Sequence, residues 1–332
     1  MLYQTLEPAL LRYVKNRQTE IFPSEAPFTL RFLAQGEYNI NYVLEQEGRK
    51  QVLRVNTASQ IRQANQIKYE YDALQLLKDS GVTPKPLYLD DSKAEIPYGL
   101  LTMEFVPGRP LRYATDLSRA ARIFGQIHSL PVPRNHPLLT EERLFSARID
   151  EAQLLLSDVW DSRAVSLPVK QFFSRFMDWA EAHRNGERYF LANRHFVINN
   201  TEVNSSNFIL GTRDVLIDWE KPVVSDPAQD ISQFLSPTTT LWKTDTVLSE
   251  EQKLAFFAAY KQALGLLDFA IEERVRLYLP YLYLRALSWC AHAWVTYHTP
   301  GRAIVNEDTR EKIRQYLAID QLKNWLRPYF TI

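Results

Sequence analysis

The sequence predicts an α+β protein with two lobes, a small one built on a mostly antiparallel sheet and a larger, mainly helical one. Two observations carry this prediction. The first hundred residues alternate apolar and polar residues in short runs around turns, and one helical stretch interrupts them. Beyond Val106-Pro107-Gly108 the apolar residues recur at helical spacing instead. We therefore expect a small N-terminal lobe of residues 1–105 and a helical C-terminal lobe of residues 106–332.

The small lobe reads as an N-terminal helix followed by strand-strand-strand-helix-strand-strand. Gly36 and Gly48 mark the turns between the first three strands, and Gly81 ends the long helix. The expected helices cover residues 4–17 and 61–79, and the expected strands cover residues 28–34, 40–46, 50–56, 86–90 and 99–106.

The larger lobe has one interruption in its helical pattern, at residues 195–220. Three short apolar runs, HFVI, NFIL and VLIDW, occur there, and the polar run NNTEVNSSN separates the first two. So many Asn, Ser and Thr side chains are unfavourable inside a helix, which indicates a loop that presents side chains from a rigid scaffold. The expected helices cover residues 117–129, 138–158, 167–185, 250–264, 268–297 and 307–326.

Composition narrows the class of protein. The 332 residues include 39 Lys and Arg against 39 Asp and Glu, so no net charge draws the chain to nucleic acid or to an anionic membrane. The single cysteine, Cys290, excludes an intramolecular disulfide and indicates a reducing compartment, for which we expect the cytoplasm. The apolar stretch 275–297 contains Pro280, Arg285 and His292, so it indicates a core helix and not a membrane span.

The polar residues that remain fit phosphoryl transfer. That chemistry needs donors over the phosphates, a cation beside them, oxygen ligands for magnesium and a carboxylate near the attacking hydroxyl. Candidates for each follow in order along the chain: Gly36 in a strand-turn-strand, Arg54 on the third strand, Glu70 on the next helix, Glu202 and Asn207 in the polar loop, and Asp218 at the end of LIDW.

Simpler explanations exist for most of these residues. Gly36 could be an ordinary hairpin glycine. Arg54 and Glu70 could form a surface ion pair of little energetic value. Glu202 could cap a turn, and Asn207 could be a turn asparagine. The segment 236–245, SPTTTLWKTD, could line a substrate site or be a polar connection between helices.

At these residues the chain resembles the aminoglycoside phosphotransferase and choline kinase family of small-molecule kinases, which have the protein-kinase-like fold. MEFVPGRPL resembles the family's hinge, ARIFGQIHSLP its helix after the hinge, and NNTEVNSSNFIL its H-x-D-x-x-x-x-N catalytic loop. IDWEKPVVSDPAQDISQFL resembles its magnesium-binding strand and the D-P-x-x-D segment behind it. The resemblance covers nearly the whole chain.

The resemblance implies an ATP-dependent kinase that uses Mg²⁺ and phosphorylates a hydroxyl of a small molecule. Glu202 would take the place of the catalytic Asp, and Asn207 and Asp218 would hold magnesium. Arg54, paired with Glu70, would hold the phosphates. The remaining implied nucleotide contacts are Gly36 and Asn39 over the phosphates and Met103, Glu104 and Val106 beside the adenine, with Asp226 and Asp230 bracing the loops.

Three positions depart from the family pattern. Arg54 replaces a Lys, Glu202 replaces an Asp and Asn200 replaces a His. Arg still holds phosphate through its planar fork. Glu adds one methylene to the catalytic carboxylate, so a catalytically impaired pseudokinase that binds a nucleotide or a partner stays open as the alternative. A protein kinase is disfavoured, because Asp218-Trp219-Glu220 stands where its D-F-G would be and no A-P-E segment occurs.

Overall fold

The computed structural model describes residues 2–36, 38–59, 63–299 and 307–330. The chain divides into two compact units. The first contains residues 1–139, 200–223 and 262–265, and the second contains residues 140–199, 224–261 and 266–332. Every residue predicted to act on the nucleotide or the acceptor falls in the first unit. The expected boundary between two lobes, at residues 105 and 106, stays a prediction.

The first unit begins with a five-stranded antiparallel sheet, which confirms the sheet expected from the alternating pattern. Its strand order is β1-β2-β3-β5-β4. Glu47 and Gly48 join β2 to β3 and both have positive φ, as a tight two-residue hairpin requires. The strands are β1 (Phe28–Gln35), β2 (Asn39–Gln46), β3 (Arg49–Asn56), β4 (Pro86–Asp90) and β5 (Gly99–Glu104).

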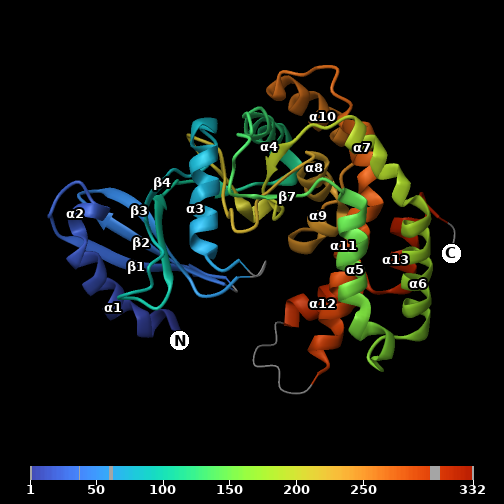
Figure 1. Ribbon diagram of the computed structural model, residues 1–332, viewed down its shortest axis with the longest axis horizontal. Coiled ribbons are helices and arrows are strands. Elements are labelled where there is room, and N and C mark those ends of the chain that lie inside the picture. The colour runs from blue at the N-terminus through green and yellow to red at the C-terminus, as the bar shows by residue number, and fades with distance from the viewer. Residues whose placement is uncertain (1, 37, 60–62, 300–306, 331–332) are drawn as a thin grey trace. The chain divides into compact units, whose positions relative to one another are not determined.

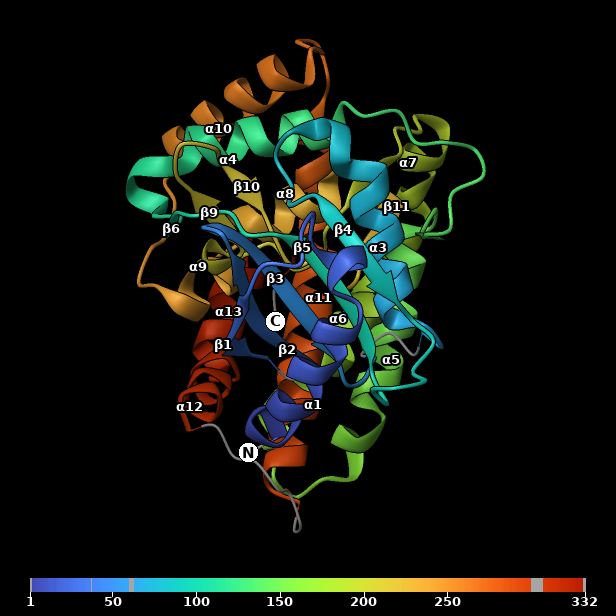
Figure 2. The same ribbon diagram turned by 90° about the vertical axis from the view of Figure 1, so that its left-hand side faces the viewer.

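Helices pack against this sheet (Figures 1 and 2). From α1 (Leu2–Asn16), Leu10 and Tyr13 join Tyr42 and Leu53 of the sheet in one core cluster. The short α2 (Gln18–Ile21) follows α1. The helix α3 (Gln66–Leu77) begins after the cap residue Asn65, whose side chain accepts a hydrogen bond from the Lys68 N–H at 3.3 Å. A 3-10 turn, η1 (Lys78–Ser80), and the left-handed Gly81 end it.

A second, smaller sheet of the first unit follows the predicted hinge. It has the order β10-β9-β6 and brings the chain after residue 106 against the polar island. Two glycines permit this approach, since a Cβ on Gly108 would lie 2.7 Å from Ile209 and one on Gly211 would lie 2.5 Å from the Pro107 carbonyl oxygen. The elements are β6 (Arg109–Pro110), α4 (Tyr113–His128), η3 (Ser205–Asn207), β9 (Phe208–Leu210) and β10 (Val215–Leu216).

The second unit is mainly helical. Its largest core joins α5 to α11, where the rings of Phe145 and Tyr281 stack with centroids 3.8 Å apart. A short sheet, ordered β7-β11-β8, lies mostly in this unit. The last residues of α10 belong to the first unit. The elements of the second unit are β7 (Leu139–Thr140), α5 (Leu144–Asp161), α6 (Leu167–His183), η2 (Arg184–Glu187), α7 (Arg188–Ala192), β8 (Val197–Asn199), β11 (Val223–Ser225), α8 (Ala228–Leu235), α9 (Pro237–Lys243), α10 (Glu250–Leu264), α11 (Ile271–Tyr297), α12 (Glu307–Tyr316) and α13 (Ile319–Leu326).

The sequence-based elements differ from the structure in several places. The helix expected over 138–158 begins at Leu144, and residues 139 and 140 form the strand β7. The helix expected over 61–79 begins at Gln66, and residues 61 and 62 lie outside the described part. The helix expected over 307–326 is two helices, α12 and α13. Most of the threonine-rich segment 236–245, considered as a substrate-site lining or a polar connection between helices, forms the helix α9, because Ser236 caps it and Pro237 occupies its first position.

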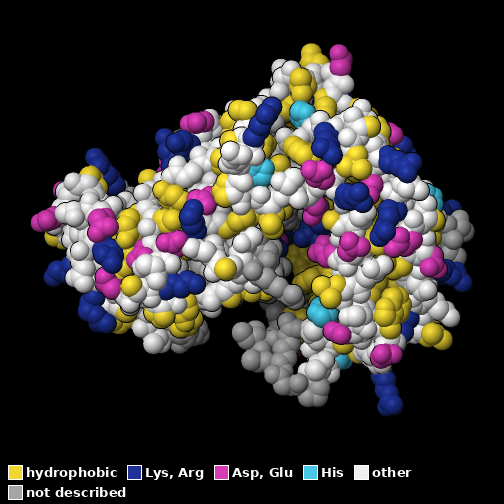
Figure 3. Space-filling view, in the orientation of Figure 1, with side chains coloured by type: hydrophobic (Ala, Val, Ile, Leu, Met, Phe, Trp, Pro, Cys, Tyr) yellow, Lys and Arg dark blue, Asp and Glu magenta, His cyan; other side chains and the backbone are white. Residues whose placement is uncertain are grey.

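The apolar stretch 275–297 falls within α11, the helix expected there. Cys290 is buried, and burial raises the pKa of its thiol to about 12. No described helix combines the length and the low polarity that a membrane crossing needs. On the face shown in Figure 3, basic and acidic side chains are interspersed, as the zero net charge suggests.

Close helix contact at Gly125 of α4 gives a first testable prediction. A Cβ there would lie 2.9 Å from the Ala263 carbonyl carbon and from the Leu264 nitrogen, and a backbone cannot give way as a side chain does. Gly125→Ala should therefore lower the free energy of unfolding by about 1–3 kcal/mol, although Ala is the better helix former. Urea unfolding measures this. The control Gln126→Ala, at the exposed next position, should change stability by less than about 0.5 kcal/mol. An equal effect of both variants would contradict the contact.

Candidate functional site

The alternation of side chains along β2 and β3 places the first group of site residues. Successive side chains of a strand point to opposite faces, and Leu53 and Val55 belong to the core with α1. Arg54 therefore points to the other face. Asn41 lies directly opposite Arg54 in the register, and its Oδ1 accepts a hydrogen bond from Arg54 Nε at 3.0 Å.

The guanidinium of Arg54 is shared by three carboxylates. It is ion-paired with Glu70 of α3, its Nη1 lies 3.2 Å from Asp218 Oδ1, and the same nitrogen lies 3.9 Å from Glu220 Oε1. Arg54 is 7% exposed and Glu70 1%. These values rule out the alternative of a surface ion pair. One cation facing three carboxylates is an arrangement that needs further positive charge.

The pKa values of the cluster reflect this imbalance. Burial raises the pKa of Glu220 to about 8, and the neighbouring Asp218 adds to the rise while Arg54 opposes it. Burial also raises the pKa of Glu70. Burial alone would lower the pKa of Arg54, but the carboxylates of Glu70, Asp218 and Glu220 outweigh it and raise this pKa. A cation bound beside Asp218 and Glu220 would relieve the repulsion between them.

The donor set fits magnesium. Mg²⁺ prefers oxygen ligands and is commonly held by one or two carboxylates together with substrate phosphates and water. Asp218 supplies a carboxylate that is partly exposed, and Glu70 Oε2 is a buried oxygen without a hydrogen-bond partner. Within the described residues, no group of three or more His, Cys, Asp or Glu side chains forms a complete metal site. The residues therefore suit a cation whose coordination is completed by substrate phosphates, and not a cation held by protein ligands alone.

The polar loop is tied to the Asp218 segment by Asn200. Asn200 Nδ2 donates to the Asp218 carbonyl oxygen at 3.0 Å, and Asn200 Oδ1 accepts from the Glu202 N–H at 3.0 Å. A fully buried asparagine thus bridges the two segments at the position where the family pattern has His. Thr201 and Asp218 both have positive φ, 65° and 67°, which is rare outside glycine. Such backbone is stable only where its surroundings fix it, as the Asn200 bridge does here.

Asn207 and Glu202 are also held together. Asn207 Nδ2 donates to the Glu202 carbonyl oxygen at 2.7 Å, and the Asn207 carbonyl oxygen accepts from the Ile217 N–H at 2.8 Å. Asn207 is thereby fixed next to the backbone that leads into Asp218. The Glu202 carboxylate does not cap the turn. Glu202 Oε1 pairs with the ammonium of Lys221 instead.

The backbone donors of the predicted hinge differ in their availability. The Glu104 N–H donates to the Lys85 carbonyl oxygen at 2.9 Å, so this group is not available to a base. The side chain of Glu104 accepts from Arg213 at 2.6 Å. Within the described chain no acceptor lies within hydrogen-bond distance of the N–H of Val106, which is partly exposed. Met103 is buried on the same face of the sheet as Arg54.

The turn at Gly36 and the residue Asn39 have different surroundings. Gly36 N–H donates to the Asn39 carbonyl oxygen at 2.9 Å, which closes the tight turn expected there. The Asn39 side chain is buried and bonded to Glu220 and Asn56. Asn39 thus contacts the acidic cluster, which consists of Glu70, Asp218 and Glu220 around Arg54. Its amide is not turned outward from the loop.

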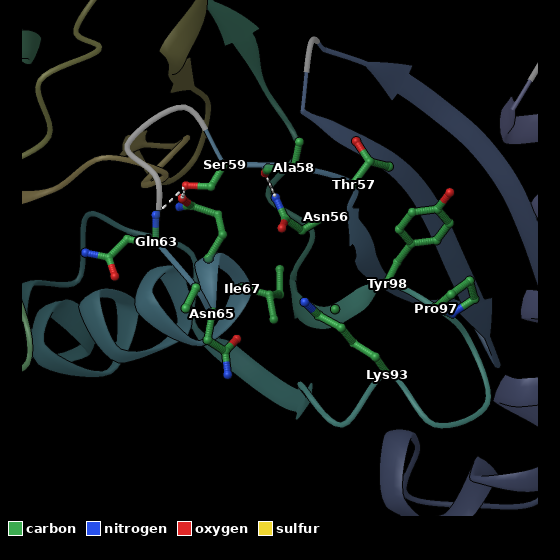
Figure 4. A pocket seen from close by; sticks show the side chains of 13 residues that line it. Asn56, Thr57, Ala58, Ser59, Gln63, Asn65, Ile67, Lys93, Pro97 and Tyr98 are labelled. Carbon is green, nitrogen blue, oxygen red and sulfur yellow. Dashed lines mark hydrogen bonds between the residues drawn. The ribbon is translucent and has the colours of Figure 1, made fainter.

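A small polar pocket of about 140 Å³ lies at the end of β3 and the start of α3 (Figure 4). None of the predicted site residues is among the residues that line it. Two lining residues connect it to the cluster, because Asn56 donates to Asn39 Oδ1 at 2.9 Å and Gln66 donates to the Glu220 carbonyl oxygen at 2.6 Å. Residues that line the pocket therefore connect to the acidic cluster, but the pocket itself is separate from the candidate site.

Asp226 and Asp230 lie in the second unit. Asp226 is ion-paired with Arg274, and both are buried. The Asp230 N–H donates to Asn199 Oδ1 at 3.3 Å. The role of the two carboxylates in bracing the loops stays a prediction.

Sequence reasoning missed three residues of the site. Asn41, Glu220 and Lys221 all contact predicted site residues. Asn41 could have been found, since it shares a strand face with Asn39 and a hairpin register with Arg54. The inward direction of Glu220 and Lys221 depends on the left-handed turn at Asp218, which sequence does not reveal.

Comparisons with known proteins agree with this geometry. A protein of Ralstonia eutropha JMP134 assigned to the aminoglycoside phosphotransferases has a TM-score of 0.67 and 14% identity, over 98% of this chain and 99% of that one. Spectinomycin phosphotransferase, solved with ADP and spectinomycin, has a TM-score of 0.63 and 11% identity, over 94% and 96%. An ethanolamine kinase of Plasmodium vivax has a TM-score of 0.58 and 15% identity, over 90% and 84%. The fold is therefore that of the kinase-like phosphotransferases.

The sequence model of the phosphotransferase enzyme family, which includes the aminoglycoside phosphotransferases, matches residues 29–278. The chain belongs to this family. No curated protein sequence matches the chain significantly. Membership supports a small-molecule phosphotransferase and confirms the resemblance drawn from the sequence motifs.

The shared guanidinium gives the second prediction. Arg54→Met should lower the free energy of unfolding by about 3–5 kcal/mol, because it leaves buried carboxylates without their cation. Urea unfolding compares it with Arg31→Met, which removes an exposed arginine of β1 and should cost less than about 0.5 kcal/mol. If Arg54→Met is as stable as the wild type, Arg54 does not hold the cluster together.

Proposed function

We propose that the protein is an ATP-dependent kinase that transfers the γ-phosphoryl group of ATP to a hydroxyl of a small molecule. The observation that supports this most is the cluster of Arg54 with Glu70, Asp218 and Glu220. It combines a fixed cation for phosphate with carboxyl oxygens for magnesium. Asn207 would supply a second oxygen ligand beside Asp218.

Similar structures support nucleotide use. Spectinomycin phosphotransferase was solved with ADP, and a thermostable mutant of the aminoglycoside phosphotransferase APH(4)-Ia was solved with AMP-PNP and hygromycin B. The APH(4)-Ia mutant has a TM-score of 0.54 to this chain. The free N–H of Val106 would bind the edge of adenine, with Met103 and the carbonyl group of Glu104 beside it. The backbone of the Gly36 turn would cover the phosphates, and Asn39 would act through Glu220.

The proposed reaction forms one bond and breaks one. The hydroxyl oxygen of the acceptor attacks the γ-phosphorus, and the bond from that phosphorus to the bridging oxygen of ADP breaks. Glu202 accepts the hydroxyl proton. Magnesium, when bound, would offset charge on the phosphates. Arg54 would orient the phosphates, Glu70 would orient Arg54, and Asn200 would keep Glu202 and Asp218 in fixed register.

A catalytically impaired pseudokinase that binds a nucleotide or a partner is the second candidate. One observation favours it, namely that Glu202 is ion-paired with Lys221, which offsets the negative charge of the proposed base. The two candidates differ in turnover and agree on nucleotide binding. For either, the single buried cysteine fits a reducing compartment, and we propose the cytoplasm.

Nucleotide binding is tested by calorimetric titration of ATP into the protein with and without Mg²⁺. The wild type should bind ATP more tightly with Mg²⁺, and Asp218→Asn should lose most of this gain because an amide is a weaker magnesium ligand than a carboxylate. Asp161→Asn, an exposed change at the end of α5, should behave as the wild type. Magnesium-dependent binding that Asp218→Asn leaves intact would argue against the assigned metal site.

Turnover is tested by the release of ADP from MgATP, with water and then with ethanolamine, spectinomycin and hygromycin B as acceptors. An active kinase releases ADP, and Glu202→Gln should slow this about 100-fold or more, because Gln cannot accept the proton. The nucleotide affinity of the variant should stay within about threefold of the wild type. Nucleotide binding without any ADP release would instead favour the pseudokinase.

A further inference from the structure

The side chain of Lys221 is buried beside the proposed base. It is 8% exposed, and its ammonium pairs with Glu202 Oε1. The Glu202 side chain is 36% exposed, so Lys221 holds the carboxylate from the protein side while leaving it open to a small molecule. Within the described residues, Glu202 is the one carboxylate paired with this ammonium.

A buried lysine without a partner is costly, since the ammonium is strongly hydrated in water. The pair therefore differs from the surface ion pairs of this chain, such as that between Lys253 and Glu250, where the carboxylate is 83% exposed. Surface pairs contribute little. A partly buried pair on a fixed backbone restricts where both charged groups lie.

The backbone that carries Lys221 is fixed by the catalytic loop itself. Thr201 Oγ1 donates to the Lys221 carbonyl oxygen at 2.8 Å, and Asn200 Nδ2 donates to the Asp218 carbonyl oxygen at 3.0 Å. The ammonium thus extends from a segment that is bonded to Asn200 and Thr201, the two residues that precede Glu202. It is placed by the same contacts that hold the left-handed Thr201.

We propose that Lys221 is a positioning residue for Glu202. Glutamate is one methylene longer and more flexible than the aspartate of the family pattern, and the ion pair fixes its carboxylate where it accepts the proton of the acceptor. This inference rests on the proposed kinase function. It explains how the loop keeps a usable base after the change from Asp to Glu.

The kinetic effect of losing Lys221 distinguishes a positioning role from a purely structural one. A misplacement of about 1 Å at a reacting group can cost roughly 100-fold in rate. Loss of Lys221 should therefore act on kcat and leave the KM for ATP unchanged. It should also act only through Glu202, so the effect should vanish once Glu202 can no longer accept a proton.

The test measures ADP release from MgATP with water as the acceptor, for Lys221→Met, Lys221→Arg and the double variant Lys221→Met/Glu202→Gln. Lys221→Met should lower kcat about 10- to 100-fold, with KM for ATP within about twofold. Lys221→Arg keeps the positive charge and should recover most of kcat. The double variant should match Glu202→Gln within about twofold. Lys253→Met is the matched surface control and should equal the wild type.

A crystal structure of Lys221→Met provides a second readout that needs no turnover. The Glu202 carboxylate should move by about 1 Å or more, or lose a single defined position. An unmoved carboxylate, or a kcat of Lys221→Met within about twofold of the wild type, would overturn the proposal. So would a loss of kcat on Lys221→Met that is as large in the Glu202→Gln background as in the wild-type background. If the wild type releases no ADP with water, ethanolamine, spectinomycin or hygromycin B, the proposed function fails, and the crystal structure still decides whether Lys221 holds Glu202.

Discussion

The shared guanidinium of Arg54 is the interaction on which the site depends. It brings together a helix carboxylate, Glu70, and two carboxylates that follow the last strand of the polar island, Asp218 and Glu220. A buried charge of this kind is stable only when its partners are fixed, and removal of one partner leaves the others uncompensated. The hairpin register, the position of α3 and the left-handed turn at Asp218 all serve to satisfy this one group.

The second constraint is the bond pattern of the polar loop. The Asn200 amide donates to the Asp218 carbonyl oxygen and accepts from the Glu202 N–H, so it links these two segments at the position where the family pattern has His. The departure at Glu202 is matched by Lys221 in the same way. The loop therefore differs from the family pattern in residue types and keeps its internal connections.

Much of this arrangement could be predicted from the sequence. The strand alternation and the turn at Gly48 define the sheet, and the family motifs identify Arg54, Glu70, Asn207 and Asp218 in the correct order. What could not be predicted depends on backbone that departs from regular structure. The inward direction of Glu220 and Lys221 follows from a positive φ at Asp218, and α9 forms because a local cap outweighs the low helix propensity of three threonines. The roles of the site residues stay predictions until nucleotide binding is measured.

The measurement that most directly tests this account is a crystal structure of the protein soaked with AMP-PNP and Mn²⁺, with the metal located by its anomalous signal. The account predicts a single strong peak about 2 Å from an oxygen of Asp218, with Asn207 as a second ligand and the phosphates against Arg54. A metal bound elsewhere, or a nucleotide whose phosphates do not approach Arg54, would contradict it.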